Sequence, residues 1–243
     1  MSGDPNSAPR HAPVDFRFLQ LLHLADSALP IGSLAHSFGL ETLVSVEMLQ
    51  TVELETFLRG YLEEAGFLEA VACREAFQLI SVEVREFPAA QWIALNALLS
   101  ALKPARESRA ASATLGRNFL RAVIGLANHD VLRQAWEASL DTHSAIHQSV
   151  AFGLAGAVLG FEESRTVTSM LHQMTANLVS ACQRLLPLGQ SEAMRILWNL
   201  KPLMAEVAAQ SHGRSLETAS CTMPLLDWGA MEHPALGTRL FVS

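Results

Sequence analysis

Apolar residues recur at intervals of three and four along most of this chain, and this spacing limits what the chain can fold into. The clearest stretches carry Leu54, Phe57, Leu58, Tyr61, Leu62 and Ala65, and then Val167, Met170, Leu171, Met174, Leu178 and Leu185. Side chains three or four residues apart share one face of an α-helix, so each stretch predicts a helix with a buried face. We find no alternation of apolar and polar residues of the kind that marks a half-buried strand. The sequence therefore predicts an all-α fold, a single-domain bundle of about ten helices.

Prolines and glycines divide the helical pattern into segments. We expect helices at residues 16–24, 33–49, 51–65, 68–85, 92–102, 106–127, 131–136, 145–160, 166–186 and 191–210. Gly66 is expected to end the third of these helices. Gly153, Gly156 and Gly160 lie three and then four residues apart, which predicts a helix surface that another backbone approaches closely.

The two ends of the chain differ from its helical middle. Residues 1–13 are polar and rich in proline, and we expect a disordered tail there, followed by a helical domain at residues 14–215. Residues 216–243 lose the helical spacing but keep large apolar side chains, namely Leu225, Leu226, Trp228, Leu240 and Phe241. Because apolar side chains favour burial, we expect this irregular C-terminal tail to dock on its own domain or on a partner.

Composition excludes some classes of function and favours others. The net charge of −7 argues against nucleic acid as the main ligand. Only 17% of the residues are charged and 50% are hydrophobic, which favours contacts with other subunits or proteins. Three widely separated cysteines without a CxxC pair predict reduced thiols in a cytoplasmic protein. No apolar run is long enough for a membrane span, and the first residues do not resemble a signal peptide.

The most unusual segment is residues 25–41, where Pro30 and Gly32 precede a histidine and a carboxylate set among apolar residues. We expect Pro30 and Gly32 to form a turn and Ser33 to cap a new helix that runs to about Leu49. Gly39 would lie inside that helix and would permit close approach of another backbone. His36, Ser37 and Glu41 would then surround the narrow contact. A tight helix crossing with a buried structural histidine explains the pattern as well as a functional site does.

The sequence lacks the motifs of common catalytic sites. It contains no GxxxxGK[ST] phosphate-binding loop and no GxSxG nucleophile elbow. His143 and His147 have a spacing that could chelate a metal on one helical face, but Ser144 stands where a HExxH motif has its glutamate. We therefore predict no catalytic residue, no cofactor and no metal ligand. A helical metal-dependent hydrolase or lyase that uses His143 and His147 is the alternative, and a structural oligomeric scaffold is a third possibility.

Several segments, in order along the chain, resemble one known family. Residues 28–41, ALPIGSLAHSFGLE, resemble the signature of UreF-type urease accessory proteins. Further similarities are Arg106, Glu107, Ser112 and Gly116; His147 with Phe152-Gly153; NLVSA at 177–181; RLLPLGQ at 184–190; and His233 with RLFVS at 239–243. Two positions depart from the family pattern: Leu34 replaces a common aromatic residue, and Val242 replaces an arginine.

The resemblance implies an all-helical, homodimeric and non-catalytic scaffold for the insertion of nickel into urease. Such a protein binds the accessory protein UreD (also called UreH), and the pair recruits the GTPase UreG to apo-urease. On this basis we expect Arg239, Leu240 and Phe241 to anchor the C-terminal tail. The face that carries His36, Ser37 and Glu41 is expected to contact the GTPase or to support the surface that does. The remaining expected partner-binding residues are Arg106 and Glu107.

Overall fold

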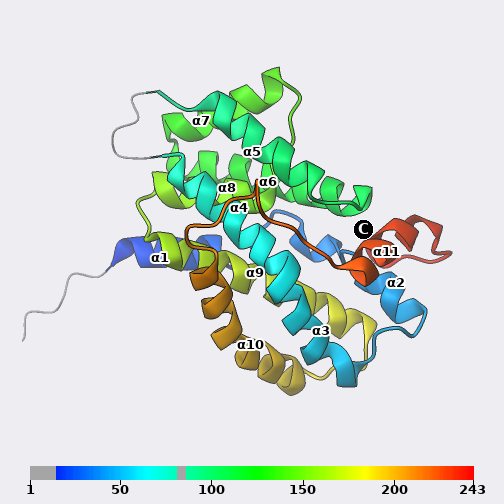
Figure 1. Ribbon diagram of the computed structural model, residues 1–243. Coiled ribbons are helices and arrows are strands. Elements are labelled where there is room, and N and C mark those ends of the chain that lie inside the picture. Colours follow the sequence, from blue (N-terminus) through cyan, green and yellow to red (C-terminus); the bar gives the residue numbers. More distant parts are fainter. Residues whose placement is uncertain (1–14, 81–85) are drawn as a thin grey trace, which may run out of the picture.

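The computed structural model describes residues 15–80 and 86–243 and shows helices joined by loops, of which the one between residues 210 and 224 is long (Figure 1). The α-helices are α1 (Phe16–Leu24), α2 (Leu40–Ser45), α3 (Leu54–Tyr61), α4 (Phe67–Gln78), α5 (Ala89–Ala101), α6 (Arg106–Ala127), α7 (Asp130–Asp141), α8 (Gln148–Val158), α9 (Glu163–Leu185), α10 (Gln190–Gln210) and α11 (Pro224–Glu232). Shorter turns are η1 (Ser33–Ala35), η2 (Thr51–Glu53), η3 (Leu62–Gly66) and η4 (His233–Ala235).

The all-α prediction is confirmed, since the described residues contain helices and no strand. The tail expected at residues 1–13 lies outside the described residues, as does the end of the helix expected at 68–85. Within residues 15–80 and 86–243, no helix combines the length and the hydropathy that crossing a membrane requires.

Helix α4 runs through the middle of the molecule, between α5 and α7 at one end and α3 and α10 at the other (Figure 1). Buried residues follow one another along it, from Leu68 to Arg74. Helix α8 packs closely against α4, because a β-carbon at Gly153 would overlap the carbonyl oxygen of Cys73. The close backbone approach predicted from the glycine spacing is confirmed at Gly153. This contact between α8 and α4 lies in the core of the domain.

The expected stop at Gly66 is wrong. A single π-helical turn, η3, joins α3 to α4, and Gly66 has right-handed helical angles (φ −60°, ψ −41°). Helix propensity disfavours glycine by only about 1 kcal/mol, and burial of the residues on both sides outweighs that preference. Leu62 and Leu68 are 0% and 2% exposed. The two predicted helices therefore form one continuous helical rod with a π turn.

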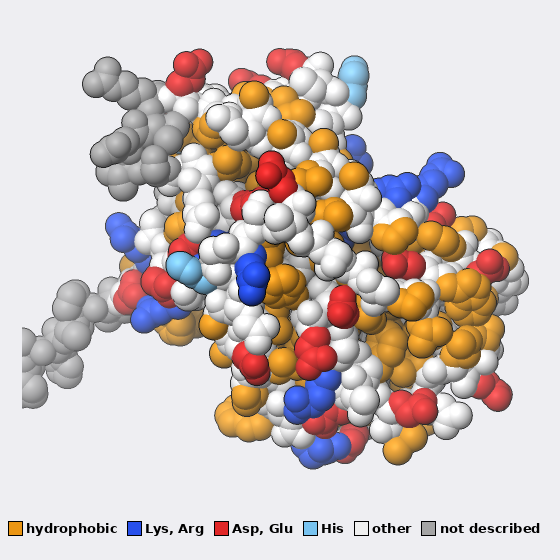
Figure 2. Space-filling model, viewed as in Figure 1, with side chains coloured by type: hydrophobic (Ala, Val, Ile, Leu, Met, Phe, Trp, Pro, Cys, Tyr) orange, Lys and Arg blue, Asp and Glu red, His pale blue; other side chains and the backbone are white. Residues whose placement is uncertain are grey.

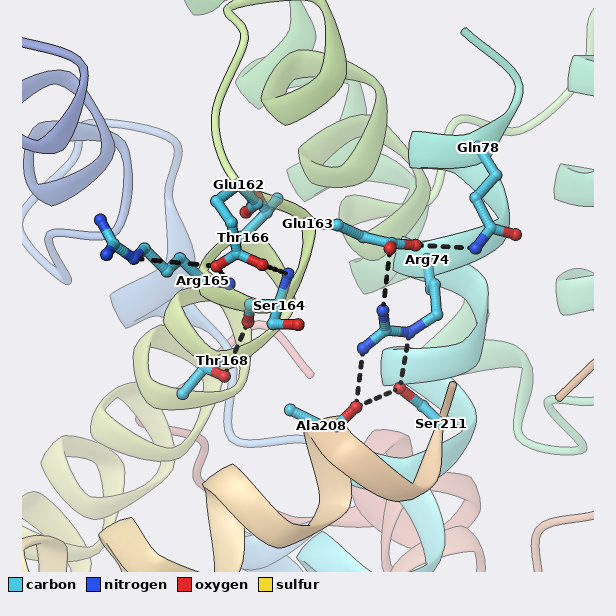
Figure 3. Close-up of polar contacts among 10 residues, drawn as sticks. All are labelled: Arg74, Gln78, Glu162, Glu163, Ser164, Arg165, Thr166, Thr168, Ala208 and Ser211. Atoms are coloured by element: carbon cyan, nitrogen blue, oxygen red, sulfur yellow. Dashed lines mark hydrogen bonds and ion pairs between the residues drawn. The ribbon is translucent and has the colours of Figure 1, made fainter. Parts of the chain in front are cut away.

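A buried arginine fixes α4 against α9 and α10 (Figure 3). Arg74 is 2% exposed and lies 3.2 Å from a carboxylate oxygen of Glu163 in α9. Its Nε donates to Ser211 Oγ at 3.1 Å, and its Nη2 donates to the carbonyl oxygen of Ala208 at 2.7 Å. A buried charge is tolerated when it is paired and hydrogen-bonded, as this one is. Periodicity does not predict this arginine in the core.

The segment at 216–243 is less irregular than the sequence predicts. It contains α11, which begins with Pro224 at a position where proline's missing N–H costs nothing. Nine residues are too few to show a clear helical period. The helix packs on α2 at a crossing of two glycines: a β-carbon at Gly39 would lie 2.6 Å from the carbonyl oxygen of Leu226, and one at Gly229 would lie 2.7 Å from that of Gly39.

The Gly153 contact predicts the effect of a single methyl group. Gly153→Ala should lower the free energy of unfolding by about 3 kcal/mol, because backbone atoms of α4 would have to move. Gly125→Ala is the matched control: it also lies inside a helix, α6, but nothing lies within 4 Å of its β-carbon position. That change should stabilise the protein by up to about 1 kcal/mol. Urea titrations compare the two, and equal effects would contradict the proposed close packing.

Candidate functional site

Residues 32–41 do not form the continuous helix that the sequence predicts. Gly32 and Gly39 have positive φ values of 91° and 93°, and Phe38 has a φ of 53°. The 3₁₀ turn η1 therefore ends at Ala35, the next residue, His36, is extended, and α2 begins only at Leu40. Gly39 was expected inside a helix and instead precedes α2 in a left-handed conformation, which is cheap for glycine. This broken path turns the backbone of Ser37 and Phe38 toward the end of the chain.

Glu41 is the centre of the contact with residues 233–243. Glu41 is 7% exposed, and its two carboxylate oxygens accept three hydrogen bonds. The backbone N–H of Leu240 donates to Oε1 at 2.5 Å, and that of Phe241 donates to Oε2 at 3.1 Å. His233 Nε2 lies 2.8 Å from Oε2. A buried carboxylate that receives several N–H groups is well satisfied, so Glu41 holds the segment through its backbone.

Ser37 and His36 bind the last residue of the same segment. A main-chain carboxylate oxygen of Ser243, the last residue of the sequence, accepts hydrogen bonds from Ser37 N at 2.5 Å, Ser37 Oγ at 3.0 Å and Phe38 N at 3.2 Å. His36 Nδ1 lies 2.7 Å from Ser243 Oγ. Between these two ends, Val242 N donates to the carbonyl oxygen of Ala35 at 2.8 Å. We call the hydrogen bonds between residues 35–41 and residues 240–243 the tail contact.

Side-chain packing adds to the tail contact. Phe241 is 5% exposed, and the guanidinium of Arg184 in α9 lies 4.2 Å from the centroid of its ring. Arg184 also donates to the carbonyl oxygen of Leu34 at 2.7 Å. Leu240 is 54% exposed and Arg239 is exposed as well. The segment thus buries one side chain and presents its neighbours to solvent.

The structure brings together six of the eight residues that the sequence singled out for partner binding. His36, Ser37 and Glu41 contact the segment that contains Arg239, Leu240 and Phe241. The other two, Arg106 and Glu107, begin α6; Arg106 is exposed and Glu107 is partly exposed. The docking of the C-terminal segment on its own domain was one of the two outcomes that its apolar residues predicted.

The histidine pair of the alternative enzyme hypothesis does not share a helical face. His143 is exposed and lies just after α7 with a φ of 53°, whereas His147 is fully buried and precedes α8. Both ring nitrogens of His147 have partners, Ser100 Oγ at 2.7 Å and Ser112 Oγ at 3.0 Å. Among the residues that the structure describes, no three histidine, cysteine or acidic side chains are grouped as a metal site.

Sequence reasoning missed a buried ion pair beside His147. Glu69 of α4 pairs with Lys103 and also accepts a hydrogen bond from Ser149 Oγ at 2.5 Å. Burial by itself raises the pKa of Glu69, but the charge of Lys103 and the hydrogen bonds lower it, and the net pKa lies below the ordinary value. The sequence offered one indication that Lys103 has a special role: it is one of only two lysines in the chain.

Comparisons with known proteins show the family of the chain. A family model described as UreF matches residues 50–201. A protein of a Nostoc species named urease accessory protein UreF is 30% identical over 234 residues, which cover 94% of this chain and 97% of that protein. Proteins of the same name from Bradyrhizobium diazoefficiens and Geobacillus kaustophilus are 29% and 28% identical, over 97% and 94% of this chain and 94% and 99% of theirs.

The geometry at Glu41 predicts how firmly residues 240–243 are held. Glu41→Gln preserves the shape but replaces one acceptor oxygen with a donor amide. We expect a loss of about 2 kcal/mol, which corresponds to about 30-fold faster amide exchange at Leu240 and Phe241. Glu53→Gln, at an exposed glutamate of η2, should leave this exchange unchanged. Unchanged protection in Glu41→Gln would contradict the assigned role.

The lowered pKa of His147 predicts that the folded protein loses stability in acid. Burial, followed by the charge of Lys103, lowers its pKa from 6.5 to about 4. Because the unfolded chain then binds the proton more readily, the contribution is complete above pH 6.5 and is lost as the pH falls toward 4. The shift predicts a loss of about 2 kcal/mol between pH 7 and pH 5.

Urea titrations at the two pH values measure this loss. His147→Gln should lower stability at pH 7 and reduce the pH dependence. His143→Gln, at the exposed histidine, should behave like the unaltered protein. A pH dependence that is the same in all three proteins would rule out His147 as its source.

Proposed function

The chain belongs to the UreF family of urease accessory proteins, and we propose that it is a scaffold that assembles other maturation proteins on urease. Urease accessory proteins assist an enzyme and are not enzymes themselves, so this chain is not an enzyme. The proposed partners are the accessory protein UreD (UreH), the GTPase UreG and apo-urease, with nickel as the cargo and the cytoplasm as the location.

One observation carries the proposal, an exposed apolar surface beside the tail contact. We call it the apolar face; its members lie on or next to α2 and α11 and in the C-terminal segment, and they are Val46, Met48, Leu225, Trp228, Met231 and Leu240. Each of these side chains is between 40% and 54% exposed. Figure 2 shows hydrophobic side chains gathered over α11 and α2, at the right of the view. Exposed apolar surface of this kind is typical of protein-binding sites.

The composition of the apolar face favours a protein partner. Trp, Met and Arg are enriched at the centres of interfaces, and here Trp228 and Met231 lie on the helix that leads into the segment with Arg239. We propose that UreD docks on this face, so that residues 216–243 form the partner-docking part of the chain. Glu41 and His36 are buried, which favours a supporting role for them.

A neighbouring hollow provides a candidate contact for the GTPase. It has a volume of about 460 Å³, and its lining includes Leu34, Arg184, Leu240 and Val242. Leu34 and Val242, the two positions that depart from the family pattern, thus lie on one hollow. We propose that UreG approaches this side and that Arg106 and Glu107, at the start of α6, belong to a further partner contact.

A second apolar surface supports the proposed homodimer. Phe16 and Leu19 of α1 and Leu126 of α6 line one groove and are 67%, 52% and 62% exposed. This groove is formed by elements other than those of the apolar face. Self-association through α1 and α6 would therefore leave α2 and α11 available to other proteins.

Co-expression with UreD and UreG, followed by size-exclusion chromatography, tests the proposal. The unaltered chain should elute with both partners. Arg239→Ala should keep the fold, because the side chain is exposed, and should weaken recruitment by about 2 kcal/mol, or roughly 30-fold in affinity.

Arg121→Ala is the matched control for this experiment. Arg121 is also exposed, but it lies on α6 and bonds only its helical neighbour Asn118. It should recruit the partners as the unaltered chain does. Failure of the unaltered chain to bind either partner would refute the scaffold, whereas equal recruitment by both variants would refute only the role of Arg239.

A further inference from the structure

The last residue of the sequence is buried, although the ends of most domains are exposed and poorly ordered. Ser243 is only 7% exposed. A terminal residue also brings a charge with it, because its main-chain carboxyl group is ionised at neutral pH. Burial of a carboxylate is costly unless hydrogen-bond donors satisfy it. The surroundings of Ser243 therefore need donors that are directed at its main-chain oxygens.

Three donors from two successive residues converge on one of these oxygens. It accepts hydrogen bonds from the N–H and the hydroxyl of Ser37 at 2.5 and 3.0 Å, and from the N–H of Phe38 at 3.2 Å. Phe38 and Gly39 have positive φ values, which turn the backbone at this point. Consecutive N–H groups that point to the same side form a concavity that binds anions. Ser37 is fully buried, so water does not compete for the oxygen.

We propose that residues 36–38 form a binding site for the terminal carboxylate of a peptide, and that its occupant is the end of this chain. Capture of a terminal carboxylate by backbone N–H groups is an established way to recognise a peptide. The other bonds of the tail contact suit such a ligand, because residues 240–242 all donate backbone N–H groups. Of these three residues only Phe241 is buried. The site thus recognises backbone, one aromatic side chain and a charged end.

A neutral carbonyl oxygen, as in a longer peptide or an amide, would fit this site less well. The three donors exceed the two lone pairs of a neutral carbonyl oxygen, and the shortest bond, at 2.5 Å, has the length of a charge-assisted one. His36 Nδ1 also lies 2.7 Å from Ser243 Oγ, so the side chain of the last residue is held as well. Because Ser243 is covered by its neighbours, a further residue would have to displace some of them.

The carboxylate contact determines which side chains the segment presents to solvent. Leu240 and Val242 are 54% and 71% exposed, while Phe241 between them is 5% exposed. Leu240 belongs to the apolar face, and Leu240 and Val242 both line the neighbouring hollow. Loss of the contact would free the end of the segment and remove these two side chains from their places. The site at residues 36–38 therefore maintains a surface that extends beyond it.

Semisynthesis of the full chain can change the terminal group alone. Cys221 permits ligation of a synthetic peptide of residues 221–243 to residues 1–220 without any substitution. One product ends in a carboxylate and the other in an amide, which has the same shape but no charge. At pH 7.5, amide hydrogen exchange at residues 240–242 should be at least about tenfold faster in the amide product. Protection of α8 reports that the domain is folded in both.

A recombinant chain with one glycine added after Ser243 tests the position of the charge, and it serves if the ligated chains do not refold. It keeps every side chain but moves the carboxylate by one residue, so exchange at residues 240–242 should again be at least about tenfold faster. Ser243→Ala is the matched control: it removes the hydroxyl that His36 bonds and keeps the carboxylate in place. Its exchange should be at most about fivefold faster.

Three results would overturn the proposal. The first is equal protection of residues 240–242 in the carboxylate and amide products, which would mean that a neutral oxygen suffices. The second is a glycine-extended chain that is protected as well as the unaltered protein. The third is a Ser243→Ala chain that exchanges as fast as the extended one, because the hydroxyl would then hold the segment.

Discussion

The close approach of α8 to α4 at Gly153 is the constraint on which the rest of the structure depends. Backbone meets backbone there, so nothing larger than glycine fits without movement. The approach lets α4 run through the core with its residues buried in succession, and the other helices are arranged around that rod. A central helix without an exposed face must also bury whatever polar residues it carries.

Those polar residues are paired, and the pairs connect α4 to its neighbours. Arg74 reaches α9 and α10, and Glu69 reaches Lys103 and α8. A buried charge that lost its partner would be costly, so each pair specifies which helix lies where. The core is thus held by apolar packing for stability and by a few ion pairs for arrangement.

Residues 28–41, which resemble the family signature, also place polar groups so that they bond another segment of the chain. Residues 32, 38 and 39 have positive φ values, which interrupt the helix in this segment. The N–H groups of Ser37 and Phe38 are therefore not used within a helix, and they donate to Ser243. Glu41 completes the contact from the first turn of α2. The result keeps residues 240–243 beside α11, so that the apolar face is composed of parts from both ends of the sequence.

The sequence by itself determined the all-α class, most of the helices and the close contact at Gly153, and it singled out residues 36, 37 and 41 and residues 239–241 without predicting that the two groups meet. These features depend on local spacing, on the small size of glycine and on a motif that can be read in order. Only the tertiary structure decided what His36, Ser37 and Glu41 bond, that Gly66 does not end a helix and that residues 224–232 are helical. The physical reason is that spacing identifies a buried face but not the segment that covers it. The partners of Glu41 lie about 200 residues away, and their hydrogen bonds come from backbone N–H groups, which every residue except proline possesses.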